Sequence, residues 1–300
     1  MYVILGATGN IGSEIANKLL AKGEKVRAVA RNAEKLRLLA NKGAETFSAD
    51  VNDTDSLLTA LAGARAAFLM IPPSMTSQDY REDQERMGES IAAAVEKSKL
   101  QYAVNLSSIG ARVSFGTGPI AGLHRFEQKL NGIGALNVLH LRPAYFMENN
   151  LAAISTIERM GIFAGALQPD LMIPMIATRD VGAYAANHLL TLDFTGKQTH
   201  ELLGERDLSM NGVTAIIGRA IDKPDLRYLQ LPYDQLDQAL TNMGIPPKSA
   251  ALFVEMYRGI NDGLVVNEEP RSLSNTTPTS FETFVQEVFV PAFRGKAASA

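Results

Sequence analysis

Gly6-Ala7-Thr8-Gly9-Asn10-Ile11-Gly12 follows the apolar run Tyr2-Val3-Ile4-Leu5 at the start of the 300-residue chain. Glycines at this spacing, between a strand pattern and a helix pattern, are typical of the turn that binds a dinucleotide pyrophosphate. Gly6 permits the tight turn, Gly9 lets a phosphate approach the backbone, and Gly12 lets helix and strand pack closely. Backbone N–H groups and the helix dipole then attract the phosphates. We therefore expect the dinucleotide to contact Gly6, Thr8, Gly9, Asn10, Ile11 and Gly12.

Composition limits the other functions that the chain can have. The net charge is −3, and a general nucleic-acid-binding protein usually carries a basic excess. There is no cysteine, and the four histidines are scattered, so we expect no metal site. No signal peptide and no apolar run of about twenty residues is visible. These features favour a cytoplasmic protein with a small-molecule substrate and no membrane partner, and they leave a homodimer open.

Strand and helix patterns alternate through the first half of the chain. This alternation with short connections predicts an α/β fold, a Rossmann-type doubly wound parallel sheet over residues 1–150. We expect residues 172–205 to return to this NAD(P)-binding domain. The strand patterns lie at Val3–Leu5, Val26–Ala30, Thr46–Ser48, Ala67–Ile71, Tyr102–Leu106 and Val138–Leu141. The helical patterns lie at Ile11–Ala21, Ala33–Ala40, Thr54–Leu61, Asp79–Glu96 and Leu123–Leu130.

After residue 150 the alternation becomes irregular. We interpret residues 151–300 as a smaller α+β lobe that lies over the cofactor cleft and binds the substrate. Its strand patterns are Met172–Ile176, Thr199–Leu203 and Leu226–Leu231. Its helical patterns are Arg179–Leu190, Asn211–Ala220, Pro232–Met243, Lys248–Asp262 and Ser280–Phe289.

The residues after the second strand pattern indicate which dinucleotide binds. An acid at this point selects NAD through the ribose hydroxyls, whereas an arginine accommodates the 2′-phosphate of NADP. Here the strand ends in Arg31-Asn32, and Lys35 follows one helical turn later. These cations favour NADP(H), although a solvated basic helix start is the alternative.

Two further strand ends supply candidate cofactor contacts. Asp50 and Val51 close the third strand, where the carboxylate can accept from the adenine amino group or belong to the cap of the next helix. Ile71 and Pro72 follow the fourth strand and should border the nicotinamide ribose. A proline rigidifies such a loop with or without a ligand.

The catalytic side lacks a familiar proton donor. None of the eight tyrosines is followed four residues later by a lysine, so the tyrosine–lysine pair that usually assists hydride transfer on a related sheet is absent. Ser107 lies at the carboxyl end of the fifth strand, where ligands bind in such sheets. His124 and Glu127 share a helical face, so the carboxylate can orient the imidazole as a proton donor. Simple capping or packing of His124 is the alternative.

The segment that leaves the sixth strand is rich in apolar and amide groups. Tyr145 and Phe146 can line a pocket for a planar ligand, with Asn149 beside them. Aromatic residues at a strand exit are more often part of the core, and both interpretations stay open.

Together these stretches resemble the NmrA-like family of atypical short-chain dehydrogenase/reductases. The resemblance is carried by Gly6–Gly12, Val26–Asn32, His124–Glu127 and Leu141–Asn149, and it extends through Ile173–Val181, Leu202–Glu205 and Thr277–Glu282. It implies an NADP-preferring Rossmann domain with a variable second lobe. It also implies one of two functions: NADPH-dependent reduction of quinones or other conjugated carbonyl compounds, or cofactor sensing without turnover through a protein partner.

Overall fold

The large sheet contains seven strands that all run parallel. A computed structural model describes residues 1–295, so the last five residues of the 151–300 segment lie outside it. The strand order is β3-β2-β1-β4-β5-β6-β10, which confirms the expected Rossmann-type sheet and adds β10 beside β6. The strands are β1 (Tyr2–Leu5), β2 (Val26–Ala30), β3 (Glu45–Ser48), β4 (Ala66–Leu69), β5 (Tyr102–Leu106), β6 (Asn137–Pro143) and β10 (Lys197–Leu202).

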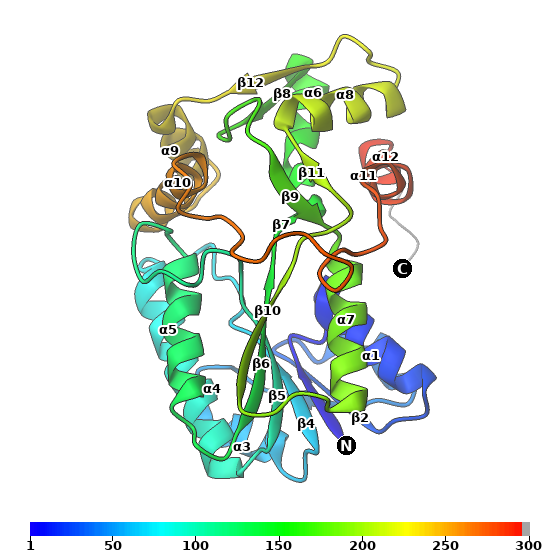
Figure 1. The fold of residues 1–300 in the computed structure, drawn as a ribbon, viewed down its shortest axis with the longest axis vertical. Coiled ribbons are helices and arrows are strands. Elements are labelled where there is room, and N and C mark those ends of the chain that lie inside the picture. Colours follow the sequence, from blue (N-terminus) through cyan, green and yellow to red (C-terminus); the bar gives the residue numbers. More distant parts are fainter. Residues whose placement is uncertain (296–300) are drawn as a thin grey trace.

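Helices cover both faces of this sheet (Figure 1). One face carries α3 (Thr54–Leu61), α4 (Tyr80–Ser98) and α5 (Ile120–Asn131). The other carries α1 (Asn10–Ala21), the short η1 (Glu34–Leu36) and α2 (Arg37–Ala40), and α7 (Thr178–Thr191). Gly182 of α7 lies so close to α1 that a Cβ there would be 2.7 Å from the Glu14 Cβ. Buried strands with helices on both faces explain the nearly continuous apolar runs of β1 and β4.

The second lobe is built around two small sheets above the carboxyl ends of the large one (Figure 1). One sheet joins β11 (Asp207–Leu208), β9 (Ile173–Ile176) and β7 (Tyr145–Phe146), and the other pairs β12 (Arg227–Gln230) with β8 (Ile162–Gly165). Within residues 172–205, β9 therefore lies in the small three-stranded sheet, whereas β10 lies in the large sheet and α7 packs on α1; the domain boundary stays a prediction. The remaining elements are η2 (Met147–Ala153), α6 (Ile154–Met160), α8 (Met210–Ala220), α9 (Tyr233–Asn242), α10 (Pro247–Asn261), α11 (Phe281–Phe284), η3 (Val285–Phe289) and α12 (Val290–Phe293).

Residues 262–280, which we call the strap, connect α10 to α11 (Figure 1). The strap has no helix or strand, and it crosses the molecule between the large sheet and the second lobe. Among the described residues, no helix is both long enough and apolar enough to cross a membrane.

Candidate functional site

The glycine turn between β1 and α1 has the geometry that close phosphate approach requires. Gly6 has φ +66°, a conformation that side chains disfavour, and a Cβ there would lie 2.8 Å from the Met70 sulfur. A Cβ on Gly12 would lie 2.8 Å from the Gly6 carbonyl carbon, so only glycine lets α1 begin this close to β1. Gly9 is the N-cap of α1, and within residues 1–295 no side chain caps its first amides. These amides fit a dinucleotide phosphate.

A cavity of about 530 Å³ extends from this turn to the second lobe. Its cofactor end is formed by Gly6, Gly9, Asn10, Ile11 and Gly12 together with Met70, Ile71 and Pro73. Its other end is mostly apolar and includes Leu123, Phe146, Ile173, Pro174, Met256, Ile260 and Val265. Such a cavity, at the carboxyl ends of parallel strands, suits a dinucleotide with a planar apolar molecule beside it.

Ser107 supplies an uncommitted hydroxyl to the cavity. It follows β5, and its N–H donates to the Leu141 carbonyl oxygen at 2.7 Å, which fixes it against β6. The side chain is buried and lines the cavity, yet its Oγ has no hydrogen-bond partner among the described residues. The neighbouring Ser108 differs, because its Oγ donates to the Ile109 carbonyl oxygen at 2.9 Å. A buried hydroxyl without a partner is costly, so Ser107 is suited to bind a ligand atom.

Tyr145, Phe146 and Asn149 all line the cavity. The Tyr145 hydroxyl is deeply buried, and the neighbouring groups Tyr257 and Tyr228 both act to raise its pKa. Burial raises the pKa of Tyr145 well above its ordinary value. A phenol with a raised pKa gives up its proton less readily, so Tyr145 forms a wall of the cavity rather than a ready acid.

Glu148 is the one carboxylate among the lining residues, and α7 already uses it. Its Oε1 accepts from the Thr178 N–H at 3.0 Å and from the Thr178 hydroxyl at 2.5 Å. Burial raises the pKa of Glu148, and the Thr178 hydroxyl opposes this shift. Glu148 thus caps the N-terminus of α7 from another element, a role that sequence spacing does not reveal.

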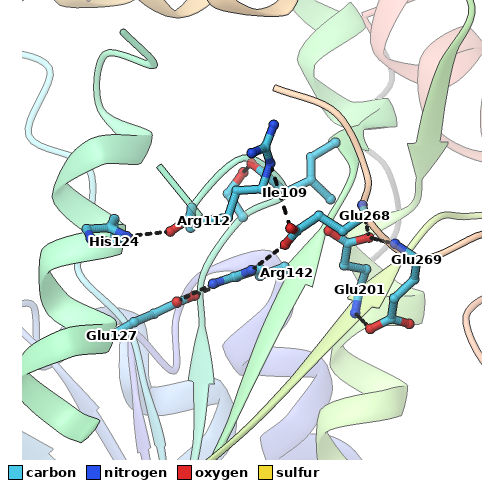
Figure 2. A network of polar contacts seen from close by, with 10 residues as sticks. Ile109, Arg112, His124, Glu127, Arg142, Glu201, Glu268 and Glu269 are labelled. Carbon is cyan, nitrogen blue, oxygen red and sulfur yellow. Dashed lines mark hydrogen bonds and ion pairs between the residues drawn. The ribbon is translucent and has the colours of Figure 1, made fainter. Parts of the chain in front are cut away.

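The expected pairing of His124 with Glu127 is wrong. Glu127 is buried and binds Arg142 with both oxygens, at 3.0 Å to Nε and 2.6 Å to Nη2 (Figure 2). The His124 Nδ1 instead lies 2.8 Å from the Ala111 carbonyl oxygen, and His124 is not among the residues that line the cavity. The helix α5 begins at Ile120, so His124 lies in its second turn rather than at its start. A catalytic role for His124 stays a prediction.

The residues expected at the adenosine end lie at the β2 and β3 edge of the sheet. Arg31 and Lys35 are exposed, and no hydrogen bond or ion pair engages either side-chain cation among residues 1–295. Asp50 accepts from the Asn52 N–H at 2.9 Å, whereas the N-cap of α3 is Asp53. The other expected contacts outside the cavity lining are Thr8, which is exposed, Val51, which is buried, and Pro72, next to the lining residues Ile71 and Pro73.

Several lining residues carry no local sequence signal. Tyr80 and Gln84 come from α4, and Met256 and Ile260 come from α10, more than a hundred residues later. Their apolar spacing predicts helix faces but not which cavity those faces border. No group of three His, Cys, Asp or Glu side chains among the described residues is placed to hold a metal ion.

The comparisons with known proteins agree with this architecture. The model of the NmrA-like family matches residues 2–285. The NAD(P)H azoreductase of Xenophilus azovorans is 28% identical over 257 residues, which is 86% of each chain. A (4-alkanoyl-5-oxo-2,5-dihydrofuran-3-yl)methyl phosphate reductase of Streptomyces griseus is 28% identical over 258 residues, again 86% of each chain. An NADPH-dependent quinone oxidoreductase of Escherichia coli, solved with NADPH, superimposes with a TM-score of 0.80 at 23% identity, over 96% of this chain and 100% of that one. The chain belongs to the NmrA-like family.

Proposed function

We propose that the protein is an NADPH-dependent reductase that delivers a hydride to an uncharged, quinone-like or conjugated carbonyl acceptor. The observation that carries this proposal is the unpartnered Ser107 hydroxyl, buried in a cavity that is continuous with the glycine turn. The two curated relatives, each named as a reductase and one of them as NAD(P)H-using, support the reaction class. The exposed cations Arg31 and Lys35 support NADPH over NADH.

The chain's own groups bind and orient the reactants. The Gly9 to Gly12 amides hold the pyrophosphate, and Arg31 binds the 2′-phosphate. The reduced nicotinamide supplies the hydride when bound. Ser107 donates a hydrogen bond to the acceptor oxygen as negative charge develops there. Because a quinone spreads that charge over its ring, a weak donor such as a serine suffices, and water delivers the proton afterwards.

Charge in the cavity favours an uncharged acceptor. Among the described residues, the lining contains the carboxylate of Glu148 and no lysine, arginine or histidine. An anionic acceptor would bury its charge without a partner, which costs several kcal/mol. We therefore expect a different acceptor from the phosphate ester that names the Streptomyces griseus relative.

A turnover assay tests the proposal. Purified protein is mixed with NADPH and with naphthoquinone, its sulfonated derivative, enones or aldehydes, and the loss of the reduced nicotinamide is followed. We expect turnover of naphthoquinone, with kcat/KM at least about tenfold higher than for the sulfonated compound. Tight NADPH binding without turnover of any acceptor would refute the reductase and support a cofactor sensor.

Two neighbouring serines provide a matched pair for the same assay. We expect Ser107→Ala to lower kcat by about tenfold to a hundredfold, because it removes the free hydroxyl at the acceptor. Ser108→Ala should change kcat little, since its hydroxyl is bound to the Ile109 carbonyl oxygen. Equal rates for the two variants would show that Ser107 does not bind the acceptor.

A further inference from the structure

The strap is fastened to the large sheet by a buried glutamate. Glu201 lies in β10, and its side chain is almost fully buried. Its Oε2 accepts from the backbone N–H of Glu268 at 2.8 Å and from that of Glu269 at 2.9 Å (Figure 2). Two backbone donors on one carboxylate fix the position of this part of the strap, because such charge-assisted bonds are stronger than neutral ones.

Arg142, on the neighbouring strand β6, holds the same point of the strap from the side. Two of its nitrogens bind the buried Glu127 of α5, as described above. Its third nitrogen, Nη1, donates to Glu268 Oε2 at 3.3 Å (Figure 2). Arg112 is in the loop after β5, and its Nε lies 3.9 Å from Glu268 Oε1. Glu268 thereby joins the strap to the loop that begins with Ser107 and to Arg142 of β6, and Arg142 in turn binds Glu127 of α5.

The fastened segment forms part of the cavity wall. Val265, three residues before Glu268, lines the cavity, and its N–H donates to the Gly259 carbonyl oxygen of α10 at 3.1 Å. It also packs on Gly110, where a Cβ would lie 3.0 Å from the Val265 Cγ1. Gly110 belongs to the loop that carries Ser107. A shift of the strap would therefore displace Val265 from the cavity wall. It would also remove the contact of Val265 with Gly110, in the loop that carries the candidate hydrogen-bond donor Ser107.

We propose that Glu201 and Arg142 are positioning residues that hold the strap against the cavity and thereby place Val265 and Ser107 for the acceptor. Neither residue lines the cavity, so both act through the strap and the loop. The proposal rests on the proposed reductase function for its kinetic consequences. The cofactor end of the cavity is formed by other elements and should be unaffected.

Kinetics and binding of substituted proteins test this proposal. Glu201→Gln keeps the size of the side chain and removes the charge that strengthens two backbone bonds, so we expect KM for the acceptor to rise about fivefold to tenfold. The dissociation constant of NADPH should stay within about twofold. Amide exchange of residues 264–269 should become faster, which a purely catalytic defect would not cause.

Three further variants cover the case in which Glu201→Gln does not fold. Glu268→Gln alters an exposed side chain and leaves the Arg142–Glu127 pair intact, so the fold should survive and KM should rise about threefold. Glu287→Gln is the matched control, because Glu287 also pairs with an arginine and is as exposed as Glu268, at 53% of the side chain. Arg142→Lys keeps the buried Glu127 paired while removing the third contact, and it should act in the same direction as Glu268→Gln.

The outcomes separate this proposal from the reductase assignment. Equilibrium binding of naphthoquinone to the protein saturated with NADP+ reports the acceptor end without any turnover. Weaker quinone binding in Glu201→Gln and Glu268→Gln, with unchanged binding in Glu287→Gln, supports the positioning role even if no acceptor is reduced. Unchanged quinone binding and unchanged exchange of the strap, or an equal loss of NADPH affinity, would overturn it.

Discussion

Replacing His140 by glutamine should change how the stability of the protein depends on pH. His140 is buried in β6, between Asn105 of β5 and Asn131 of α5. The Asn105 Nδ2 donates to His140 Nδ1 at 3.0 Å, and His140 Nε2 donates to Asn131 Oδ1 at 3.0 Å. These two bonds satisfy a neutral imidazole. Burial lowers the pKa of His140 to about 4, and the nearby Arg142 also lowers it while Glu127 opposes the shift.

The sign and size of the effect follow from this depressed pKa. The reference pKa of histidine is 6.5, so below that pH His140 is protonated in the unfolded chain and stays neutral in the folded protein. The contribution of His140 to the free energy of unfolding should therefore be constant above pH 6.5 and fall as the pH drops toward about 4. Below that pH this contribution should change no further. The separation of the two pKa values corresponds to about 3 kcal/mol. Burial raises the pKa of Glu148 and of Glu201, and these groups act in the opposite direction.

Urea unfolding at a series of pH values between about 7 and about 4 measures this effect. Because Glu148 and Glu201 titrate in both proteins, the difference between His140→Gln and the unsubstituted protein isolates the imidazole. We expect His140→Gln to be less stable at neutral pH and to lose about 3 kcal/mol less on acidification. The control is His188→Gln, at a half-buried histidine whose Nδ1 lies 2.6 Å from Asp193 Oδ1. This variant should show the same loss of stability on acidification as the unsubstituted protein. A His140→Gln curve parallel to that of the unsubstituted protein would refute the reasoning.

Three further substitutions test the site. Arg31→Ala should weaken NADPH binding by about tenfold or more and leave NADH binding nearly unchanged, as measured by nicotinamide fluorescence; equal losses would show that Arg31 does not read the 2′-phosphate. Gly12→Ala should weaken binding of both cofactors, because its Cβ would meet the Gly6 carbonyl carbon at 2.8 Å, and intact binding in the same titration would contradict this geometry. His124→Gln should lower kcat less than Ser107→Ala does, since the imidazole is bound to the Ala111 carbonyl oxygen; a large fall in kcat with loss of a pH limb would restore its catalytic role.

The sequence predicted the large domain well because its signals are local. The buried strands β1 and β4 are short apolar runs, and the turn at Gly6 to Gly12 lies within seven residues. The sequence pattern predicts no element over residues 147–165, because η2, α6 and β8 are short and follow one another without a sustained period. The expected start of α5 at Leu123 was three residues late, since Pro119 and Ile120 carry no polar capping signal.

The side-chain pairs of the site could not be predicted in the same way. Helical spacing placed His124 and Glu127 on one face, yet it could not show that Arg142, fifteen residues from Glu127 and on another element, would take the carboxylate. That contact depends on how α5 lies against β6, which is fixed by packing over the whole sheet. A buried carboxylate is stable only with a full set of partners, so the arginine fork is the physically preferred neighbour over a single imidazole nitrogen.

The two ends of the cavity therefore differ in how the chain builds them. The cofactor end is made largely by one turn and the strand ends beside it, whereas the acceptor end gathers Ile173, Met256 and Val265 from β9, α10 and the strap. Polar contacts hold these distant segments together: the Val265 N–H binds the Gly259 carbonyl oxygen of α10, and Glu201 and Arg142 bind the strap at residues 268 and 269. Substitutions in the strap or α10 can therefore alter which acceptor is bound while the glycine turn still holds the dinucleotide. If the proposed reductase function holds, we expect the preference for an acceptor to depend on how the strap and α10 are positioned, and the effect of Glu201→Gln on KM tests this expectation.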